Sequence, residues 1–199
     1  GWAGRVDGAA GVRAPPEADS RVSGAACGCD RNARPPTLAT IRALASSNHT
    51  LAATSAGCLF SWGRRGALGH GGSGASPQRV SALSGVRIVS VAASPSHSLA
   101  ATAQGWLFSF GSGESGQLGH CDWEPQPLPS RVMSLAAVVV TAVACGDYCS
   151  FALSAEGAVY SWGLSPSLGH GQHGAAHVEE PAPRRVEALR AERVAAIAA

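Results

Sequence analysis

One segment of this sequence occurs three times, and this repetition limits the folds that the chain can adopt. Each copy combines a glycine, an aromatic stretch that ends in Gly, and the tripeptide Leu-Gly-His. The histidines of the tripeptide are His70, His120 and His170, so the copies recur at a constant spacing. A period of roughly 50 residues is typical of repeat proteins, in which each unit buries its apolar face against the next. The sequence therefore predicts a series of similar units.

The aromatic stretch of each copy predicts a β-strand. Phe60 and Trp62 fall on one face, and Leu59 and Ser61 fall on the other. Alternation with a period of two residues is a strand pattern, whereas a helix would repeat at 3.6. The other two copies repeat the alternation with Phe108, Phe110, Tyr160 and Trp162. Four short strands in a unit of about 50 residues are typical of a propeller blade.

The positions of the strands divide the chain into units at residues 44–90, 91–142 and 143–196, with 197–199 beginning a fourth. We expect an apolar strand to close each unit, at Ile88–Ala93, Val140–Cys145 and Val194–Ala199. The expected fold is all-β, with three four-stranded blades in an incomplete propeller ring. Since propellers close with about 4 to 8 blades, three blades do not complete a ring.

The first part of the chain, residues 1–40, differs from the repeats that occupy 41–199. It is rich in Gly, Ala, Pro and Arg and shows no hydrophobic period. Such a composition offers too little apolar surface to offset the entropy lost on ordering. We expect a disordered, low-complexity linker here. Because the chain begins at Gly1 and its only methionine is Met133, we also expect it to be a piece of a longer protein.

Composition argues against two classes of partner. The chain has 15 basic residues, all of them arginine, against 13 acidic ones, and no clustered basic stripe. A nucleic-acid partner is therefore not expected for this segment. The longest apolar run, Leu135–Cys145, is far shorter than the roughly 20 residues of a membrane-spanning helix, so no membrane span is expected.

The sequence predicts no catalytic, metal-binding or cofactor-binding residues, and we do not expect an enzyme. A phosphate-binding loop of the Gly-Lys type cannot form without lysine, and the cysteine spacings match no zinc motif. The densest group of metal-ligand side chains is His170, His173, His177, Glu179 and Glu180. These residues fall in a stretch of Gly, Ala and Pro, so we expect a solvated loop.

The repeated motifs resemble those of the regulator of chromosome condensation family. That family pairs Gly-x-x-His-Thr-Leu-Ala and Gly-x-Val-Tyr-Ser-Trp-Gly with Gly-Gln-Leu-Gly-His-Gly, and the best match here is Gly116-Gln-Leu-Gly-His120. The resemblance extends over residues 41–199 and departs at Cys149, where the family has His. It implies part of a seven-bladed propeller. It also implies an intracellular protein of the cytoplasm or nucleus, with no indication of its oligomeric state.

Partner binding is expected in the connections where the repeats differ, at residues 71–76, 121–128 and 171–182. Trp123 is the best candidate for an interface anchor, because Trp is enriched at binding hot spots. The alternative, that Trp123 folds back over its own blade, stays open. The candidate partner-binding residues are Asp122, Trp123, Glu124, His173, His177, Glu179, Glu180, Arg64 and Arg65.

We therefore predict a non-enzymatic protein-interaction scaffold that presents variable loops to a macromolecular partner. The resemblance leaves two alternatives. One is guanine-nucleotide exchange on a small GTPase, Ran-like or other, although no wedge-like insertion stands among the three units. The other is the substrate-recognition part of a larger ubiquitin-ligase or adaptor protein.

Overall fold

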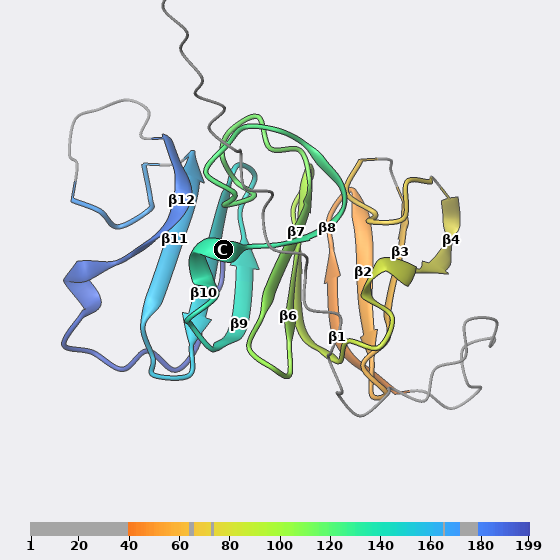
Figure 1. The fold of residues 1–199 in the computed structure, drawn as a ribbon, viewed down its shortest axis with the longest axis horizontal. Coiled ribbons are helices and arrows are strands. Elements are labelled where there is room, and N and C mark those ends of the chain that lie inside the picture. Colours follow the sequence, from red (N-terminus) through yellow and green to blue (C-terminus); the bar gives the residue numbers. More distant parts are fainter. Residues whose placement is uncertain (1–39, 64–65, 73, 165, 172–178) are drawn as a thin grey trace, which may run out of the picture.

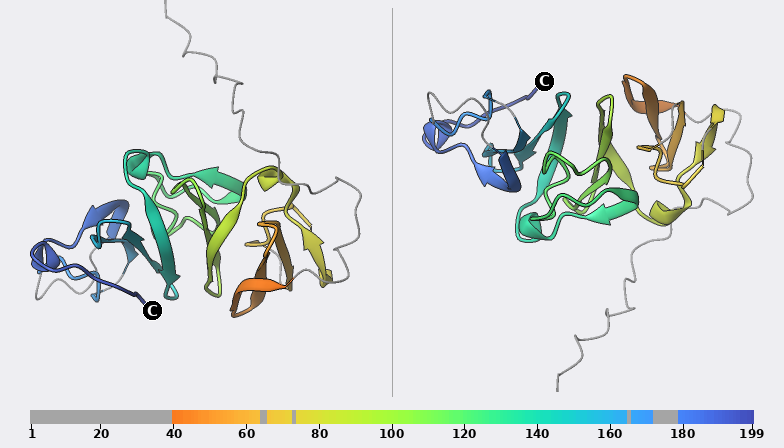
Figure 2. Two further views of the ribbon diagram at one scale, coloured as in Figure 1. Left: turned by 90° about the horizontal axis from the view of Figure 1, so that it is seen from below. Right: turned by 90° about the horizontal axis from the view of Figure 1, so that it is seen from above.

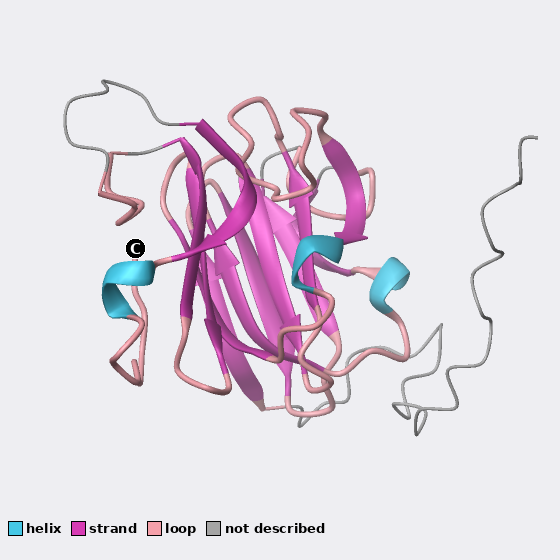
Figure 3. Ribbon diagram, turned by 60° about the vertical axis from the view of Figure 1, so that its left-hand side comes forward, coloured by secondary structure: helices cyan, strands magenta, loops and turns pink. Residues whose placement is uncertain are grey.

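The computed structural model describes residues 40–63, 66–72, 74–164, 166–171 and 179–199. Apart from Thr40, the stretch for which we predicted disorder lies outside the described residues. The described chain contains three antiparallel sheets of four strands each, as predicted, and we call these sheets blades 1, 2 and 3 (Figure 1). The remaining regular elements in this part of the chain are three single-turn 3-10 helices (Figure 3).

Each blade takes four consecutive strands in order. Blade 1 contains β1 (Ile41–Ser46), β2 (His49–Thr54), β3 (Leu59–Gly63) and β4 (Gly74–Arg79). Blade 2 contains β5 (Ile88–Ala93), β6 (His97–Thr102), β7 (Leu107–Gly111) and β8 (Gln126–Arg131). Blade 3 contains β9 (Val140–Cys145), β10 (Cys149–Ser154), β11 (Val159–Leu164) and β12 (Glu179–Arg185). The short helices η1 (Ser81–Leu83), η2 (Met133–Leu135) and η3 (Glu187–Leu189) follow the fourth strands.

The three blades stand side by side and spread like a fan, as the views along their long edges show (Figure 2). The first strand of each blade packs against the first strand of the next, so β1 contacts β5 and β5 contacts β9. The fourth strands, β4, β8 and β12, form the outer edges of their sheets. This arrangement is an arc of a propeller.

Two expectations about the closing strands were wrong. The strand Ile88–Ala93 does not close the first unit, because it pairs with β6 and opens blade 2. Val140–Cys145 likewise opens blade 3 by pairing with β10. The third segment, Val194–Ala199, is not a strand. For the first two segments the physical reason is the same, because each forms its sheet hydrogen bonds with the strand that follows it. For Val194–Ala199, no strand among the described residues is available as a pairing partner.

The predicted loops also overlap the outer strands. β4, β8 and β12 begin within the predicted loops 71–76, 121–128 and 171–182. These strands carry Pro at several positions, as in Gln126–Arg131, whose sequence is QPLPSR. An edge strand has a neighbour on one side only, so proline can occupy it without the loss of a sheet hydrogen bond. Proline on an edge also protects the sheet from pairing with other chains.

The alternation of the aromatic strands places two different faces on each blade. Phe110 is fully buried among Leu51, Leu59 and Val80 of blade 1, so the aromatic face of blade 2 packs on blade 1. Trp162 is buried in the same way among the aliphatic side chains of blade 2. Each pair of neighbouring blades is therefore joined by a continuous apolar core.

The C-terminal residues cover part of blade 3. Val194 and Ile197 pack against the apolar cluster of Leu153, Val159 and Val186. The Val194 amide donates a hydrogen bond to the carbonyl of Gly157, at 3.1 Å. Equivalent bonds run from Ile88 to Gly57 and from Val140 to Gly105, each at about 3 Å. The segment therefore follows the path of a first strand without forming one.

Candidate functional site: the loop face

One end of all three blades is formed by connections that differ between the repeats, and we call this end the loop face. It consists of the described residues in the turns 47–48, 94–96 and 146–148 and in the longer connections 64–73, 112–125 and 165–178. The strand register places the two kinds of connection together. In blade 2, for example, His97 pairs with Gly111, and Gly111 pairs with Gln126.

A hydrogen-bond relay holds blade 2 to blade 3 just below the loop face. His97 Nε2 lies 2.8 Å from Ser150 Oγ, and Ser150 Oγ donates to the carbonyl of Gln117, also at 2.8 Å. Because the single hydroxyl proton of Ser150 is used in this way, the proton on the His97 ring is assigned to Nε2, which donates to Ser150. Ser94 Oγ, 2.7 Å from Nδ1, then donates to the other ring nitrogen.

A second relay of the same kind joins blades 1 and 2. His49 Nε2 lies 2.6 Å from Ser98 Oγ, which donates to the carbonyl of Ala67 at 2.7 Å. In blade 3 the corresponding position is Cys149, which is buried. These histidines belong to the architecture of the blades, and they fix the loops of neighbouring blades relative to one another.

Burial determines the charge of these histidines. Burial, together with the nearby charge of His49, lowers the pKa of His97 to about 3. Burial also lowers the pKa of His49. An imidazole with a depressed pKa is neutral near pH 7, as the relay requires, because Ser94 must donate to an unprotonated nitrogen of His97.

The contact between blades 2 and 3 is closed at the loop face. Trp162 Nε1 donates to the carbonyl of Gln117 at 2.8 Å, and Gln117 itself is buried. The amide of Cys121 donates to the carbonyl of Pro181, at 3.0 Å. A Cβ added to Gly116 would lie 2.8 Å from the Cα of Pro181, so the two backbones touch.

The corresponding contact between blades 1 and 2 is open. The connection between Gly63 and Leu68 is two residues shorter than that between Gly111 and Leu118, and Ala67 stands where blade 2 has Gln117. A Cβ added to Gly66, the counterpart of Gly116, would meet nothing within 4 Å.

A cavity of about 550 Å³ opens at this point. Asn48 and Gly66 of blade 1 line one side, and blade 2 supplies Pro95, Glu114 and Pro127. A second opening of about 320 Å³ lies between Pro127 and the glycines of the Leu-Gly-His corner of blade 1. Cavities of about 300 to 1,000 Å³ are of the size that proteins use to bind ligands.

The loop that carries Trp123 is anchored, while its indole remains half exposed, at 50%. A Cβ added to Gly113 would overlap the Glu124 carbonyl and lie 3.2 Å from the Trp123 carbonyl carbon, so the backbone rests on blade 2. The Glu124 amide donates to Asp122 Oδ1 at 3.2 Å. Asp122 therefore shapes the turn, and Trp123 and Glu124 face solvent from a fixed position.

The remaining predicted residues are not gathered into one site. Glu179 and Glu180 begin β12, so they do not lie in a loop as predicted. Glu180 forms an ion pair with Arg184, with an N–O distance of 3.5 Å, whereas Glu179 is exposed. The other candidates, Arg64, Arg65, His173 and His177, lie outside the described residues.

The histidines of the Leu-Gly-His corners lie in three different blades and bond locally. His120 Nε2 is 2.9 Å from Ser109 Oγ, and His170 Nε2 is 3.1 Å from Ser161 Oγ. Burial lowers the pKa of His120, and the carboxylate of Asp122 partly opposes this shift. His70 Nδ1 accepts from the Gly72 amide at 3.2 Å. Within the described residues, no three His, Cys, Asp or Glu side chains lie close enough together to hold a metal ion.

One exposed aromatic residue of the loop face was missed by the sequence analysis. Tyr148, in the turn between β9 and β10, is 55% exposed, and its carbonyl accepts a hydrogen bond from the Leu164 amide. Its counterparts are Asn48 and Ser96, so the repeats disagree here as they do around Trp123. A comparison of the short turns, in addition to the long connections, would have found it.

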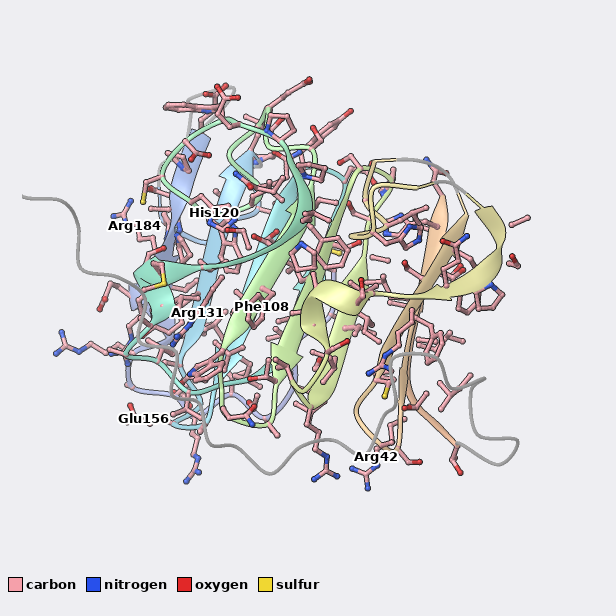
Figure 4. All side chains as sticks on the ribbon, turned by 45° about the vertical axis from the view of Figure 1, so that its right-hand side comes forward. Arg42, Phe108, His120, Arg131, Glu156 and Arg184 are labelled. Atoms are coloured by element: carbon pink, nitrogen blue, oxygen red, sulfur yellow. The ribbon has the colours of Figure 1, made fainter. Side chains whose placement is uncertain are left out.

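Charge is distributed unevenly over the described residues. Exposed carboxylates on the loop face belong to Glu114, Glu124 and Asp147. None of the eight described arginines lies in the loop-face connections; they are Arg42, Arg79, Arg87, Arg131, Arg184, Arg185, Arg190 and Arg193. Figure 4 shows His120 toward the loop face, with Arg42 and Glu156 at the opposite end. Among the described helices, none has the length and apolar character needed to cross a bilayer.

Comparison with known proteins gives consistent matches over the blades. Residues 56–101 and 104–153 match the family model of the regulator of chromosome condensation (RCC1) repeat, and 88–117 and 140–172 match a second model with the same description. The chain is 36% identical over 175 residues to the mitochondrial RCC1 domain-containing protein RUG3 of Arabidopsis thaliana, covering 79% of this chain and 38% of that protein.

Two further similar proteins are longer than this chain. It is 35% identical over 184 residues to the E3 ubiquitin-protein ligase HERC2 of Homo sapiens, which covers 85% of this chain and 4% of that protein. It superimposes with a TM-score of 0.64 and 25% identity on Prp20p from Saccharomyces cerevisiae, described with its binding properties to Gsp1p and histones. That match covers 81% of this chain and 41% of Prp20p. The chain thus spans well under half of the length of these relatives.

Proposed function

Because the chain belongs to the regulator of chromosome condensation repeat family, we propose that it acts as a non-enzymatic protein-interaction scaffold that presents its loop face to a macromolecular partner. The observation that carries this proposal is the anchored loop of Trp123, whose backbone rests on Gly113 while its indole stays half exposed. A large aromatic side chain in a fixed position makes an efficient anchor, because it loses little conformational entropy on binding.

The structure supports presentation by a rigid scaffold. The cross-blade relays of His49 and His97 lie directly under the loop face. The blades themselves are joined by continuous apolar cores. Loops on such a framework are preorganised, so a partner meets a surface whose shape is set before binding.

The test is capture of a partner protein by the 199-residue chain and by its Trp123→Ala variant. We expect the variant to lose binding by at least tenfold, the range that separates hot-spot residues from neutral contacts, while its melting temperature stays unchanged. Met133→Ala is a matched control, because Met133 is a large apolar side chain, 65% exposed, in η2 and outside the loop face.

Two results would contradict the proposal. Equal binding by the Trp123 and Met133 variants would show that the loop face is not the contact surface. A fall in melting temperature for Trp123→Ala alone would give Trp123 a structural role.

A second candidate function is guanine-nucleotide exchange on a small GTPase. The likeness to Prp20p favours it, since that structure is described with binding to Gsp1p. If this function belongs to the chain, adding it to small GTPases of the Ran, Rab and Arf types will speed the release of labelled GDP. No acceleration with any of them would remove this candidate.

A third candidate, favoured by the likeness to HERC2, is the substrate-recognition part of a larger ubiquitin ligase or adaptor. It predicts that the complete open reading frame encodes a further domain fused to the repeats. The same reading frame would count the blades and test the proposed division into a linker at 1–40 and repeat units at 41–199.

A further inference from the structure

The cavity between blades 1 and 2 is open to solvent along its rim. Pro95, Glu114, Pro125 and Pro127, which line it, are all exposed residues. A slot with an exposed rim and a volume of about 550 Å³ is accessible to an extended peptide segment that runs across the loop face. Three proline rings supply apolar contact, while Asn48, Ser96 and Ser112 add polar side chains to the wall.

Among the described residues, Glu114 is the one charged residue that lines the cavity. No ion pair joins it to any other residue in the described ranges. The nearest part of the loop face adds the exposed carboxylates of Glu124 and Asp147, and no described arginine lies there to balance them. The Glu114 carboxylate would repel an acidic segment that entered the cavity, and it would stay without an ion-pair partner beside a neutral segment.

An arginine side chain matches both the proline rings of the cavity wall and the negative charge of Glu114. Its methylene stem can pack against the proline rings while its charged end stays polar. Its planar guanidinium matches a carboxylate with two parallel hydrogen bonds. Lysine would supply the charge without this geometry.

We infer that the cavity between blades 1 and 2 receives an arginine side chain from a basic segment of the partner protein, with Glu114 as its counter-ion. This inference rests on the proposed interaction function and adds the chemistry of the partner. The equivalent place between blades 2 and 3 cannot serve in this way, because Pro181 lies directly against Gly116. The basic segment can therefore bind at the contact between blades 1 and 2 and not at the contact between blades 2 and 3.

The test measures binding of fluorescein-labelled nona-arginine to the 199-residue chain by fluorescence anisotropy. Nona-citrulline, which keeps the shape of the side chain and removes its charge, is the neutral probe. We expect Glu114→Gln to weaken the binding of nona-arginine roughly three- to fivefold, the effect of one partly exposed ion pair. We expect nona-citrulline to bind neither the unmodified chain nor the variant. Binding will also weaken as salt is added.

Glu156→Gln is the matched control. Glu156 is an exposed carboxylate that lines another cavity, of about 260 Å³, at the opposite end of the blades (Figure 4). The control removes the same charge from the chain, and we expect it to leave the affinity for nona-arginine within about 1.5-fold, as for a remote exposed charge.

Four results would overturn the inference. Equal effects of the Glu114 and Glu156 variants would mean that the peptide responds to net charge alone. Equal binding of nona-citrulline would remove the role of the guanidinium. A several-fold gain in affinity for the double variant Arg64→Ser and Arg65→Ser, lost when Glu114→Gln is added, would identify the chain's own arginines as the occupant. If Trp123→Ala abolishes partner capture while Glu114→Gln changes nothing, the interaction function stands and this inference fails.

Discussion

The two contacts between neighbouring blades are built from corresponding residues, yet they differ at the loop face. Both contain the relay from a histidine through a serine to a carbonyl, with His49 and Ser98 in one and His97 and Ser150 in the other. Between blades 2 and 3, the Trp162 indole and the Gln117 carbonyl add a further hydrogen bond. Between blades 1 and 2 the counterpart of Trp162 is Phe110, which has no polar atom to donate.

The difference shows how a repeat protein can vary its surface without changing its core. Two fewer residues between Gly63 and Leu68 leave Gly66 without a contact, and a cavity takes the place of the junction that Gly116 and Pro181 form. The apolar cores below are continuous in both contacts. Variation at the ends of the blades therefore costs little stability, and it can be used for recognition.

The largest effect on stability is expected from the relay histidines, His97 and His49. His97→Ala will lower the free energy of unfolding by about 3 kcal/mol, because it removes two side-chain hydrogen bonds and leaves a buried cavity. His49→Ala will cost only about 1 to 2 kcal/mol, since this ring has one side-chain partner among the described residues, Ser98. Urea denaturation followed by circular dichroism measures both. Equal losses in the two variants would remove the distinction between the contacts.

Acid will lower the free energy of unfolding through the same histidines. In the unfolded chain a histidine binds its proton near pH 6.5, whereas the pKa of folded His97 is lowered to about 3. The unfolded state therefore binds more protons between these values, so stability is complete above about pH 6.5 and falls toward pH 3. The loss is up to about 1.4 kcal/mol per pH unit for each buried histidine.

The variant His97→Phe is the control for this titration, because it keeps a ring in the core and removes the proton. We expect the dependence of unfolding free energy on pH between 6 and 4 to become shallower in that variant. A slope identical to that of the unmodified chain would assign the acid effect to other groups.

Two glycines provide a smaller comparison of the contacts. Gly66 and Gly116 both have a positive φ, of 112° and 71°, so alanine strains the backbone at either position. Only at Gly116 does the new methyl also meet Pro181. We expect Gly66→Ala to cost about 1 kcal/mol and Gly116→Ala about 1 kcal/mol more, measured as unfolding free energy. A greater loss for Gly66→Ala would contradict the open contact.

Much of the fold could be predicted because the blades are built from local patterns. The alternation of Phe60 and Trp62 with Leu59 and Ser61 defines a strand from neighbouring residues alone, and the three copies confirm one another. The outer strands were harder, because proline-rich segments such as Gln126–Arg131 have no hydrophobic alternation. Ile88–Ala93 was assigned to the wrong blade because its pairing partner lies after it, in β6, and spacing alone does not reveal the direction of pairing.

The loop face could be predicted only in part, for a different physical reason. Trp123 was found because a large aromatic residue stood where the repeats disagree. The relay of His97 could not be found, since its partner Ser150 is 53 residues away and belongs to another blade. The cavity exists because Gly66 lacks the contact that Gly116 makes with Pro181. Such a difference can be seen only when the blades are packed together.

Locating a bound arginine on the chain is the most direct test of the cavity between blades 1 and 2. Two-dimensional amide NMR spectra of the 199-residue chain, recorded during titration with nona-arginine, report where the local environment changes. We expect the largest changes at Ser96, Ser112 and Glu114, around the cavity between blades 1 and 2. Changes centred instead on Cys121 and Ala182, beside the hydrogen bond from Cys121 to Pro181 at the closed contact between blades 2 and 3, or spread evenly over all exposed carboxylates, would contradict it.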